Sequence, residues 1–356
     1  MAIINHNSRN RLIRDLSISF VIYSLPVVAI FLYFKLTNGF VAESHLTLPS
    51  FLEFSKPAFE HIRTWGLTAF MLVLGVIEFT AGLYDDDWTG EERKVDIVCF
   101  LAPKLLLPPV IAFFSLTALP YLIPNLANSL SWVPFWGGFF LIAIADDLTQ
   151  YWYHRLHHQV PFLWRFHRTH HSAPYMGMAM ASRQNFIYTI LFSQIYLTAT
   201  LTYLGLGLPA LFVLVIKSFI TLGAHSSIKW DKPFYKYKVL HPIAWVLERV
   251  ISTPATHHAH HADTSGDGVG HFKGNFGNMF FIWDIIFGTA LITRKYPKSY
   301  GMKSYKQEEW YAQFLWPIFK SKKEGSALAE GVLAVPIRAK AENVTAGPVL
   351  YEQAQS

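Results

Sequence analysis

Only 15% of the 356 residues are charged, whereas 52% are hydrophobic and 16% are aromatic. Soluble proteins carry about 25% charged residues, so this composition excludes an ordinary soluble enzyme and indicates an integral membrane protein. The formal net charge of +6 comes without a module of stacked aromatic and basic residues, so it points to anionic lipid headgroups and not to nucleic acid.

Six apolar runs follow a basic amino terminus that ends at residue 15. Most of them approach the roughly 20 residues that an α-helix needs to cross a bilayer. They cover residues 16–36, 65–84, 97–123, 132–152, 186–203 and 206–222. We therefore predict an all-α membrane protein with about six membrane-crossing helices, within a range of four to six.

Two places in these runs predict irregular structure. The third run contains Lys104 and the pair Pro108 and Pro109, so we expect a break, a tilt or a shallow hairpin there. The last two runs are joined by a short segment with Gly205 and Gly207, which predicts a helical hairpin over residues 186–222.

Three histidine clusters with the common spacing H-x-x-H-H lie between or after the later runs. They are His154, His157 and His158; His167, His170 and His171; and His257, His260 and His261. Residues three and four apart share one face of a helix, so each cluster can present up to three imidazole nitrogens from one turn. Three such clusters exceed the needs of one ion and favour two metals in a shared site.

The donor type narrows the choice of metal. Neutral imidazole suits iron, zinc, copper or nickel. Cys99 is the only cysteine, so the sequence argues against an iron–sulfur or thiolate site and allows no internal disulfide.

Topology can be checked against the positions of the clusters. Arg9, Arg11 and Arg14 precede the first run, which places the amino terminus in the cytoplasm by the positive-inside rule. Six crossings then bring residues 154–171 and everything beyond residue 222 to that same side. We therefore expect a cytoplasmic, histidine-rich helical cap that holds a di-metal centre, in a bacterial inner membrane or, as the alternative, in the endoplasmic reticulum.

The residues around the clusters resemble the fatty acid hydroxylase/sterol desaturase superfamily over about 146–289. The resemblance rests on the segments Asp147–Ser172, Thr253-Pro254, Asn275-Phe-Gly277 and Ile282–Thr289. It implies a membrane-bound non-haem di-iron enzyme that uses dioxygen and two electrons to hydroxylate, desaturate or cleave a lipid. The domains then read as 1–15 cytoplasmic, 16–145 membrane helices, 146–295 catalytic region, and 296–356 a cytoplasmic segment whose tail, after about residue 320, is loosely ordered.

The resemblance also assigns the ligands, on which catalysis would depend. The first motif of the family is H-x-x-x-H, which selects His154 and His158 and leaves His157 as an alternate. The family also has an isolated histidine between the second and third clusters, and His225 matches it. The implied ligands are His154, His158, His167, His170, His171, His225, His257, His260 and His261.

Seven further residues are candidates for contacts around the ligands: Asp147, His157, Arg183, Asn185, His241, His258 and Asp284. Asp147 lies seven residues before His154 and is expected either to fix a ligand histidine through its second ring nitrogen or to be a solvated helix-end carboxylate. Asp284 is expected to organise the cap. His271, in a glycine-rich loop, is a weaker candidate for an additional ligand.

One departure from the family bears on the substrate. Many members carry Arg-x-His soon after the second cluster, whereas Asn185 stands at the histidine position here, after Arg183 and Gln184. This form is more similar to the branch with alkylglycerol monooxygenase and bacterial lipid hydroxylases, which favours a hydroxylase of a fatty acyl, alkyl-glycerol or aminolipid substrate. A sterol or isoprenoid desaturase or a methyl-sterol oxidase is the alternative.

Electrons must come from outside the chain, because the sequence has no G-x-G-x-x-G strand–helix unit and no cytochrome or iron–sulfur motif. The expected donor is a separate reductase, ferredoxin or cytochrome, or a pterin. Two other classes remain open: a histidine-rich metal transporter, which should carry more ionisable residues inside its spans, and a non-catalytic metal-binding membrane protein.

Overall fold

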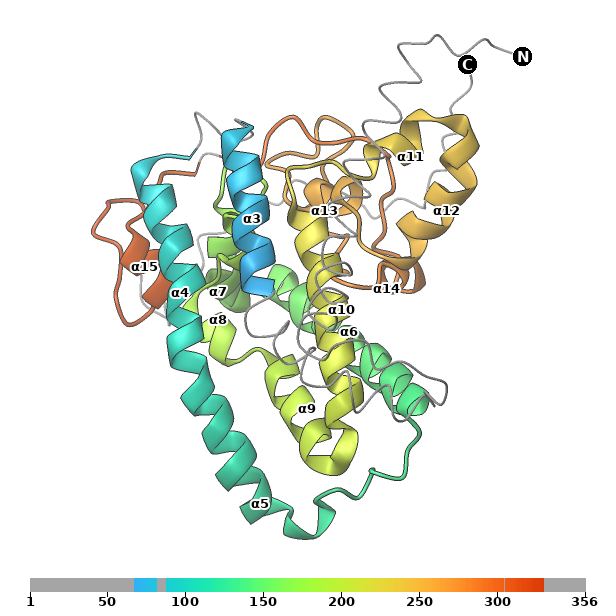
Figure 1. Cartoon of the computed structure of the whole chain (residues 1–356). Helices are drawn as coiled ribbons and strands as arrows, with labels where there is room; N and C mark the ends of the chain where they lie inside the picture. Colours follow the sequence, from blue (N-terminus) through green and yellow to red (C-terminus); the bar gives the residue numbers. More distant parts are fainter. Residues whose placement is uncertain (1–66, 82–87, 304, 330–356) are drawn as a thin grey trace.

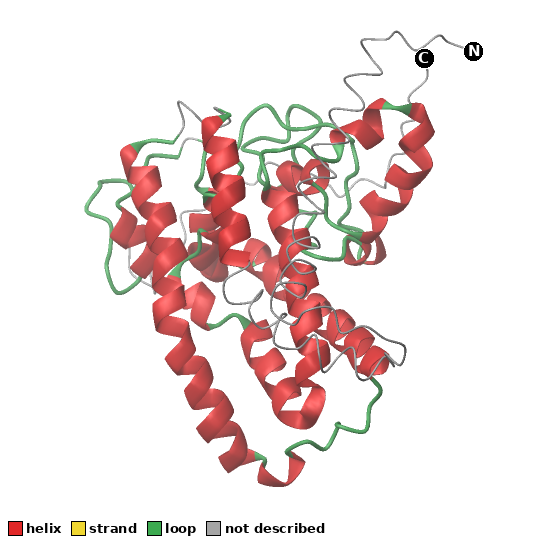
Figure 2. Cartoon of the chain, viewed as in Figure 1, coloured by secondary structure: helices red, strands yellow, loops and turns green. Residues whose placement is uncertain are grey.

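A computed structural model describes residues 67–81, 88–303 and 305–329. Within these ranges the chain forms helices and loops with two isolated bridges and no strand, as Figure 2 shows, which confirms the prediction of an all-α protein. The apolar run predicted at 16–36 lies outside the described residues.

The first two described helices stand side by side in Figure 1. Helix α3 spans Leu67–Thr80 and lies within the run predicted at 65–84, whose ends are outside the described residues. Helix α4 spans Gly90–Phe113 and continues through the π-helical segment Phe114–Ala118 into α5, Leu119–Leu122.

The sequence explains the start of α4 and the irregular turn that follows its prolines. The Thr89 hydroxyl accepts a hydrogen bond from the Glu92 backbone N–H at 3.5 Å and so caps the start of α4. The helix contains Pro103, Pro108 and Pro109, yet it does not break where a break, tilt or hairpin was expected. Instead the wider π-helical turn follows the prolines, a local adjustment that can satisfy carbonyls left without donors.

Four further helices build the centre of the molecule. Helix α6 spans Phe135–Gln159 and leads through a one-residue turn into α7, Pro161–His171. Helix α9, Ser193–Leu201, and helix α10, Gly207–His225, form an antiparallel hairpin whose tip lies near α5 in Figure 1. The short elements between and around these helices are α8 (Phe186–Ile190), the π-helical segment Thr202–Leu206, and 3₁₀ turns at Pro124–Leu126, Met180–Ser182 and Lys238–Leu240.

Gly205 makes the tip of the hairpin. Its φ of 106° lies in the left-handed region, and a Cβ at this position would meet the Ser131 backbone nitrogen at 2.9 Å. The tip is tied to Asn128 and Leu130, whose backbone N–H groups donate to the carbonyls of Tyr203 and Leu204 at 3.0 and 2.8 Å. Only glycine fits both the conformation and the close approach.

We expect a Gly205→Ala substitution to destabilise the protein by about 1–3 kcal/mol, because alanine adds both backbone strain and a clash. The melting temperature in detergent measures the effect. Gly90→Ala is the matched control, since a Cβ at Gly90 meets no atom within 4 Å. Equal melting temperatures for the two variants would contradict the role given to Gly205.

Two segments of the described chain are long and apolar enough to cross a membrane: Gly90–Leu122 and Phe186–His225. The second is not one straight helix, because it is interrupted near residue 192 and turns back at Gly205. Large apolar side chains of the segment Gly90–Leu122 are exposed, including Leu105 at 76% and Leu116 at 78%. Such exposure suits a lipid environment. Helix α6 is not among these segments, although a crossing was predicted at 132–152.

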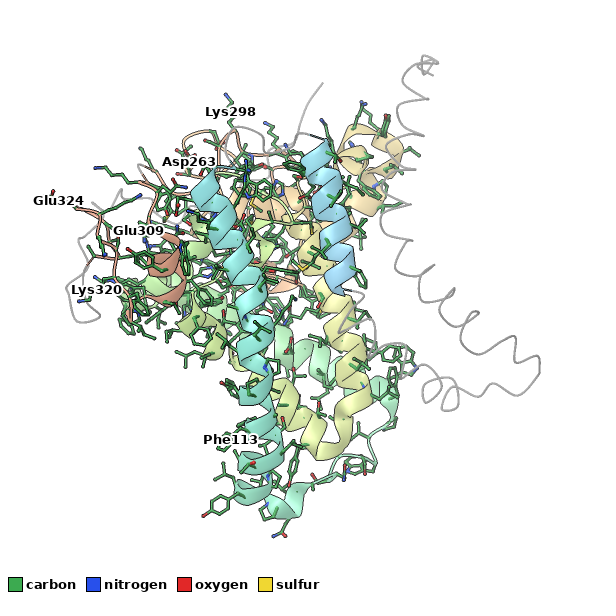
Figure 3. The ribbon with its side chains drawn as sticks, turned by 60° about the vertical axis from the view of Figure 1, so that its left-hand side comes forward. Phe113, Asp263, Lys298, Glu309, Lys320 and Glu324 are labelled. Carbon is green, nitrogen blue, oxygen red and sulfur yellow. The ribbon has the colours of Figure 1, made fainter. Side chains whose placement is uncertain are left out.

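The rest of the chain forms a more polar region of short helices and loops. The helices are α11 (Lys232–Lys236), α12 (His241–Val250), α13 (Pro254–His260), α14 (Ile282–Ile286) and α15 (Trp310–Leu315). Figure 3 shows the charged side chains of Asp263, Lys298, Glu309, Lys320 and Glu324 in its upper half, whereas Phe113 lies near the lower end of α4. These charged residues thus lie away from the lower end of α4.

Residues 321–329 differ from the expected loose tail. Leu328 is buried in a cluster with Phe166 and Trp316, and its carbonyl accepts a hydrogen bond from the Ser321 N–H at 3.0 Å. This return of the chain covers α7, which carries the second histidine cluster. The remainder of the predicted tail, 330–356, lies outside the described residues.

Candidate metal centre

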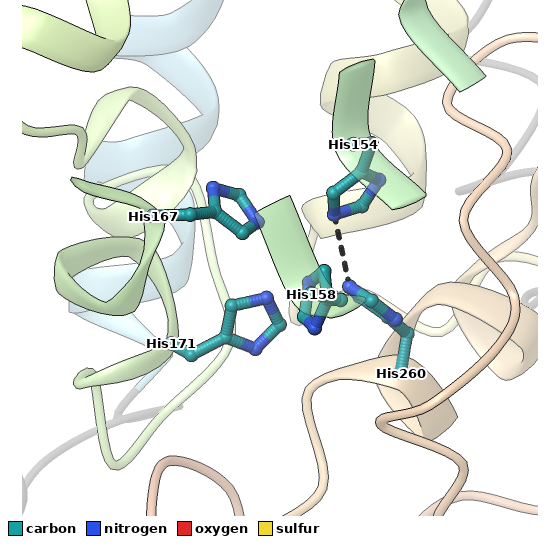
Figure 4. Close-up of side chains that lie close together, drawn as sticks. All are labelled: His154, His158, His167, His171 and His260. Carbon is teal, nitrogen blue, oxygen red and sulfur yellow. Dashed lines mark hydrogen bonds between the residues drawn. The ribbon is translucent and has the colours of Figure 1, made fainter. Parts of the chain in front are cut away.

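The fold brings all nine predicted ligands together in two groups, and within each group the ligand atoms lie within 4.8 Å of one another. The first group is His154, His158, His167, His171 and His260, shown in Figure 4; the second is His170, His225, His257 and His261. The groups adjoin, since the rings of His171 and His261 stack with centroids 4.3 Å apart. Two neighbouring sites rich in imidazole are therefore present.

The three clusters divide between the groups by a simple rule. In each cluster the residues at positions i and i+4 join the same group, as His167 and His171 do. The residue at i+3 joins the other group, as His170 and His260 do, or neither group, as His157 does. A triplet therefore does not serve one ion, because the i+3 ring is rotated away from the i/i+4 pair around the helix.

Local sequence signals place these helices. A proline occupies the first turn of α7 and of α13, where its missing N–H costs nothing. Helix α13 also begins with a capping box, in which Thr256 Oγ1 accepts from the Thr253 N–H at 3.0 Å. His225 comes from the last turn of α10, whose end meets α13.

Backbone carbonyls orient four of the rings. The Nδ1 atoms of His154, His225 and His260 lie 2.7 Å from the carbonyl oxygens of Phe276, Thr221 and Gly274. His170 Nδ1 lies 3.1 Å from the Arg183 carbonyl. Each of these contacts requires a proton on Nδ1, which leaves Nε2 as the free lone pair that can bind a metal.

The Nε2 atoms left free point at one another. His257 Nε2 lies 2.9 Å from His225 Nε2, which lies 3.3 Å from His170 Nε2, and in the other group His260 Nε2 lies 3.1 Å from His154 Nε2. Two nitrogens bound about 2.1 Å from one ion at about 90–110° are about 3.0–3.4 Å apart. The spacing therefore fits shared metal ligands in both groups.

Several other ring nitrogens are buried without a hydrogen-bond partner among the described residues: His158 Nε2, His167 Nδ1 and Nε2, His171 Nε2, His257 Nδ1 and His261 Nε2. Buried polar atoms in native proteins nearly always have a partner. A bound ion in each group would supply it, so the donor set fits a pair of metal ions.

The electrostatics of the site favour the metal-binding form of histidine. Burial lowers the pKa of His154 to about 4 and that of His158, His170, His260 and His261 well below the usual value, and neighbouring imidazoles add to the effect. The rings are therefore neutral at pH 7 in the metal-free protein. Neutral imidazole is the form that coordinates metals.

Asp284 organises the loop that holds the first group, as predicted for the cap. Its carboxylate accepts hydrogen bonds from the N–H groups of Phe276 and Gly277 at 2.8 and 2.7 Å and from the Thr289 hydroxyl at 2.6 Å. Burial raises the pKa of this carboxyl to about 7, and these three bonds oppose the rise. Because the Phe276 carbonyl holds His154, Asp284 positions a ligand indirectly.

Asp147 plays neither of the two roles expected of it. It is fully buried, not solvated, and it accepts hydrogen bonds from the N–H groups of Met279 and Phe280 and from Trp283 Nε1 at 3.2, 2.8 and 3.0 Å. No histidine of the described chain bonds to it. Asp147 contacts the loop after residue 276 although it lies two turns before His154 on the same face of α6.

Arg183 and Asn185 lie beside the second group without joining it. Apart from its carbonyl, Arg183 forms ion pairs with Glu92 and, at 3.5 Å, with Asp96 of α4. Asn185 accepts from the Ile187 N–H at 2.8 Å, capping α8, and donates to the Trp316 carbonyl at 2.9 Å. The residue that replaces the family's histidine is therefore a structural cap here.

The remaining candidate histidines stay outside both groups. His157 Nδ1 lies 2.7 Å from the Tyr153 carbonyl, one turn back in α6. His258 is held by the Tyr300 hydroxyl and the Ser226 carbonyl, both at 3.1 Å. His241 and His271 contact the carbonyls of Tyr235 and Thr289, also at 3.1 Å.

Sequence reasoning missed Gln313 of α15. Its side-chain oxygen accepts from the Ser172 hydroxyl at 2.9 Å and from Arg183 Nη2 at 3.3 Å, and its carbonyl accepts from the Thr169 hydroxyl at 2.9 Å and Asn185 Nδ2 at 3.2 Å. Gln313 thus ties α7 to residues 183–185. No local signal could have revealed it, because the partners lie about 130 to 144 residues away.

A cavity of about 220 Å³ opens beside both groups. His154, His167, His170 and His225 form part of its wall, and Tyr188 and Phe192 are among the aromatic residues that line the rest. A small organic group can therefore approach the ring nitrogens from this side. His257 and His261 do not line this cavity and are buried.

Residues 139–289 match the family model described as fatty acid hydroxylase. All nine histidines and the loop that holds them lie within this range. The match confirms the resemblance to the superfamily of fatty acid hydroxylases and sterol desaturases. Neither a curated protein nor a solved structure matches the chain.

Proposed function

We propose, from the premise that residues 139–289 belong to the fatty acid hydroxylase family, that the protein is a membrane-bound non-haem di-iron oxygenase that hydroxylates a lipid. One observation carries the proposal: nine histidines, eight of them buried and His158 partly buried, form two adjoining groups that contain ring nitrogens without a hydrogen-bond partner among the described residues. Two irons held there would supply the activation of dioxygen that oxidation of an inert C–H bond requires.

The chain's own residues bind, orient and shield. The carbonyls of Gly274, Phe276 and Arg183 fix the rotation of their histidine rings, so each lone pair is aimed before metal arrives. Burial of the rings keeps bulk water from the centre, which protects reactive species from side reactions. The cavity next to His154 and His170 is where the lipid carbon would approach.

We propose the cellular location and the electron donor from the apolar segments and the family match. The two long apolar segments and the family support a membrane protein; we add six crossings, a cytoplasmic centre and a bacterial inner membrane. A separate donor, such as a reductase, ferredoxin, cytochrome or pterin, would deliver the electrons. The Arg183–Asn185 sequence favours the alkylglycerol monooxygenase-like and bacterial lipid hydroxylase branch.

Comparative lipidomics tests the reaction. Cells that express the protein are expected to contain a lipid that has gained the mass of one oxygen atom, because hydroxylation inserts one. Cells that express a His170→Ala variant, which lacks a ligand of the second group, should not contain it.

Membrane insertion of the variant is checked by fractionation and immunoblotting. A lipid that has lost the mass of two hydrogen atoms, instead of gaining that of one oxygen atom, would indicate that the reaction is desaturation and not hydroxylation. An unchanged lipid profile in cells that make inserted, iron-loaded protein would contradict the oxygenase proposal as a whole.

A further inference from the structure

A second, larger cavity of about 1070 Å³ lies among the apolar helices. Residues of α3, α4, α6, α9 and α10 line it, from Met71 to Leu222. Gln150, Phe192 and Thr221 line both this chamber and the small cavity at the histidines. The chamber therefore adjoins the small cavity at the candidate metal centre.

The wall of this chamber carries polar groups that have no partner. Gln194 is 4% exposed, and neither its Oε1 nor its Nε2 has a hydrogen-bond partner among the described residues. The same holds for Gln150 Oε1, also on a residue 4% exposed, and for Thr221 Oγ1. The residues that carry these atoms come from three helices, α6, α9 and α10, and all three line the chamber.

Buried amide side chains without hydrogen-bond partners are unexpected in the wall of an apolar cavity. A buried polar group without a partner destabilises the fold, and an apolar side chain would fill the same space without that cost. The two glutamines in the wall of the chamber are therefore explained if the ligand of the chamber completes their hydrogen bonds.

Two of the three charged groups that line the chamber pair with each other, and the third contacts an aromatic ring. Lys217 forms an ion pair with Asp146, which also accepts a hydrogen bond from the Thr198 hydroxyl at 3.4 Å. The ammonium group of Lys104 lies over the ring of Phe100, 4.5 Å from its centroid. The unpaired positions are thus neutral amides and a hydroxyl.

We propose that the chamber binds the lipid substrate and that Gln150 and Gln194 recognise a neutral hydrogen-bonding group on it, an amide or a hydroxyl. The unpaired Oε1 atoms of both residues require a donor, and Gln194 Nε2 requires an acceptor. An amide or hydroxyl offers both, whereas a carboxylate offers only acceptors and a hydrocarbon neither. This inference rests on the proposed function and names its substrate class.

Equilibrium binding to the purified, iron-loaded full chain in detergent tests the proposal. The probes share one chain length: octadecanamide, octadecan-1-ol, octadecane and octadecanoate. Wild-type protein is expected to bind the amide or the alcohol about tenfold or more tighter than the alkane, as one or two neutral hydrogen bonds would give. Gln194→Leu should lose most of this preference, and Gln150→Leu part of it.

A second readout separates recognition from a structural role. Because leucine removes unpaired amide atoms, Gln194→Leu should melt at the same or a higher temperature than the wild type when no lipid is bound. Gln159→Leu is the matched control, since Gln159 is exposed at the end of α6 and lines neither cavity. It should leave both melting and the binding preference unchanged.

The possible outcomes differ for the two proposals. Equal binding of amide, alcohol and alkane, tightest binding of octadecanoate, or a preference that survives in Gln194→Leu would overturn this inference and leave the oxygenase proposal standing. Selective binding of the amide by a protein that adds no oxygen to lipids would support this inference and contradict the oxygenase proposal, because binding can be measured without turnover.

Discussion

A His260→Ala variant is expected to hold one iron per chain where the wild type holds two, and to form no product. His260 supplies the ligand that α13 contributes to the first group, where its Nε2 lies 3.1 Å from that of His154. Loss of a residue that merely orients a ligand costs about 10–100-fold in metal affinity, so loss of the ligand itself should cost more. Iron analysis after anaerobic reconstitution with ferrous iron measures the effect.

His258→Gln provides the control on the same helix. His258 is as deeply buried as His260, but it contacts Tyr300 and Ser226 and belongs to neither group. Glutamine can keep hydrogen bonds to both partners, so this variant should retain two irons and activity. Two irons in His260→Ala, or fewer than two in the wild type, would count against the division into two metal groups.

Replacement of Asp284 by alanine is expected to have the second large effect. It leaves the buried N–H groups of Phe276 and Gly277 without an acceptor, at about 1–3 kcal/mol for each. It also frees the loop whose carbonyl orients His154, so iron at the first group should be bound about 10–100-fold more weakly. Melting temperature and iron content report the two effects separately.

Glu248→Ala tests whether any buried carboxylate has this effect. Glu248 is 1% exposed and pairs with Arg249 and Arg294 at 2.8 and 2.7 Å, on α12 and away from both histidine groups. This variant should lose stability and keep its full iron content. If it lost iron as Asp284→Ala does, the loss would follow from general destabilisation and the role of Asp284 in orienting a ligand would be refuted.

The spacing of the histidines could predict much of the candidate site but not how it is divided. Spacing shows which residues share a helical face, so His154 with His158 and His167 with His171 could be paired from sequence. Which group His170 or His260 joins depends on how α7 and α13 face each other. The orientation of α7 relative to α13 depends on tertiary packing, which the sequence of one helix does not determine.

Contacts distant in sequence were the least predictable. Asp147 lies in a helical register that suggests a histidine partner, yet its partners Met279 and Phe280 lie more than 130 residues later. The unpaired amides of Gln150 and Gln194 are ordinary polar residues in sequence and acquire meaning only from the chamber between the helices. Apolar runs likewise predicted the helices but not that α6 would carry Asp146 and Asp147 buried in its middle.

The order in which the ligands are synthesised has a consequence for assembly. His154 and His260, which meet in one group, are 106 residues apart, and the whole α9–α10 hairpin is translated between them. The second group likewise includes two residues, His257 and His261, that are synthesised after the hairpin. The first group is therefore incomplete until His260 has been synthesised and the second until His261 has, so neither set of ligands can assemble in full before the α9–α10 hairpin has been made.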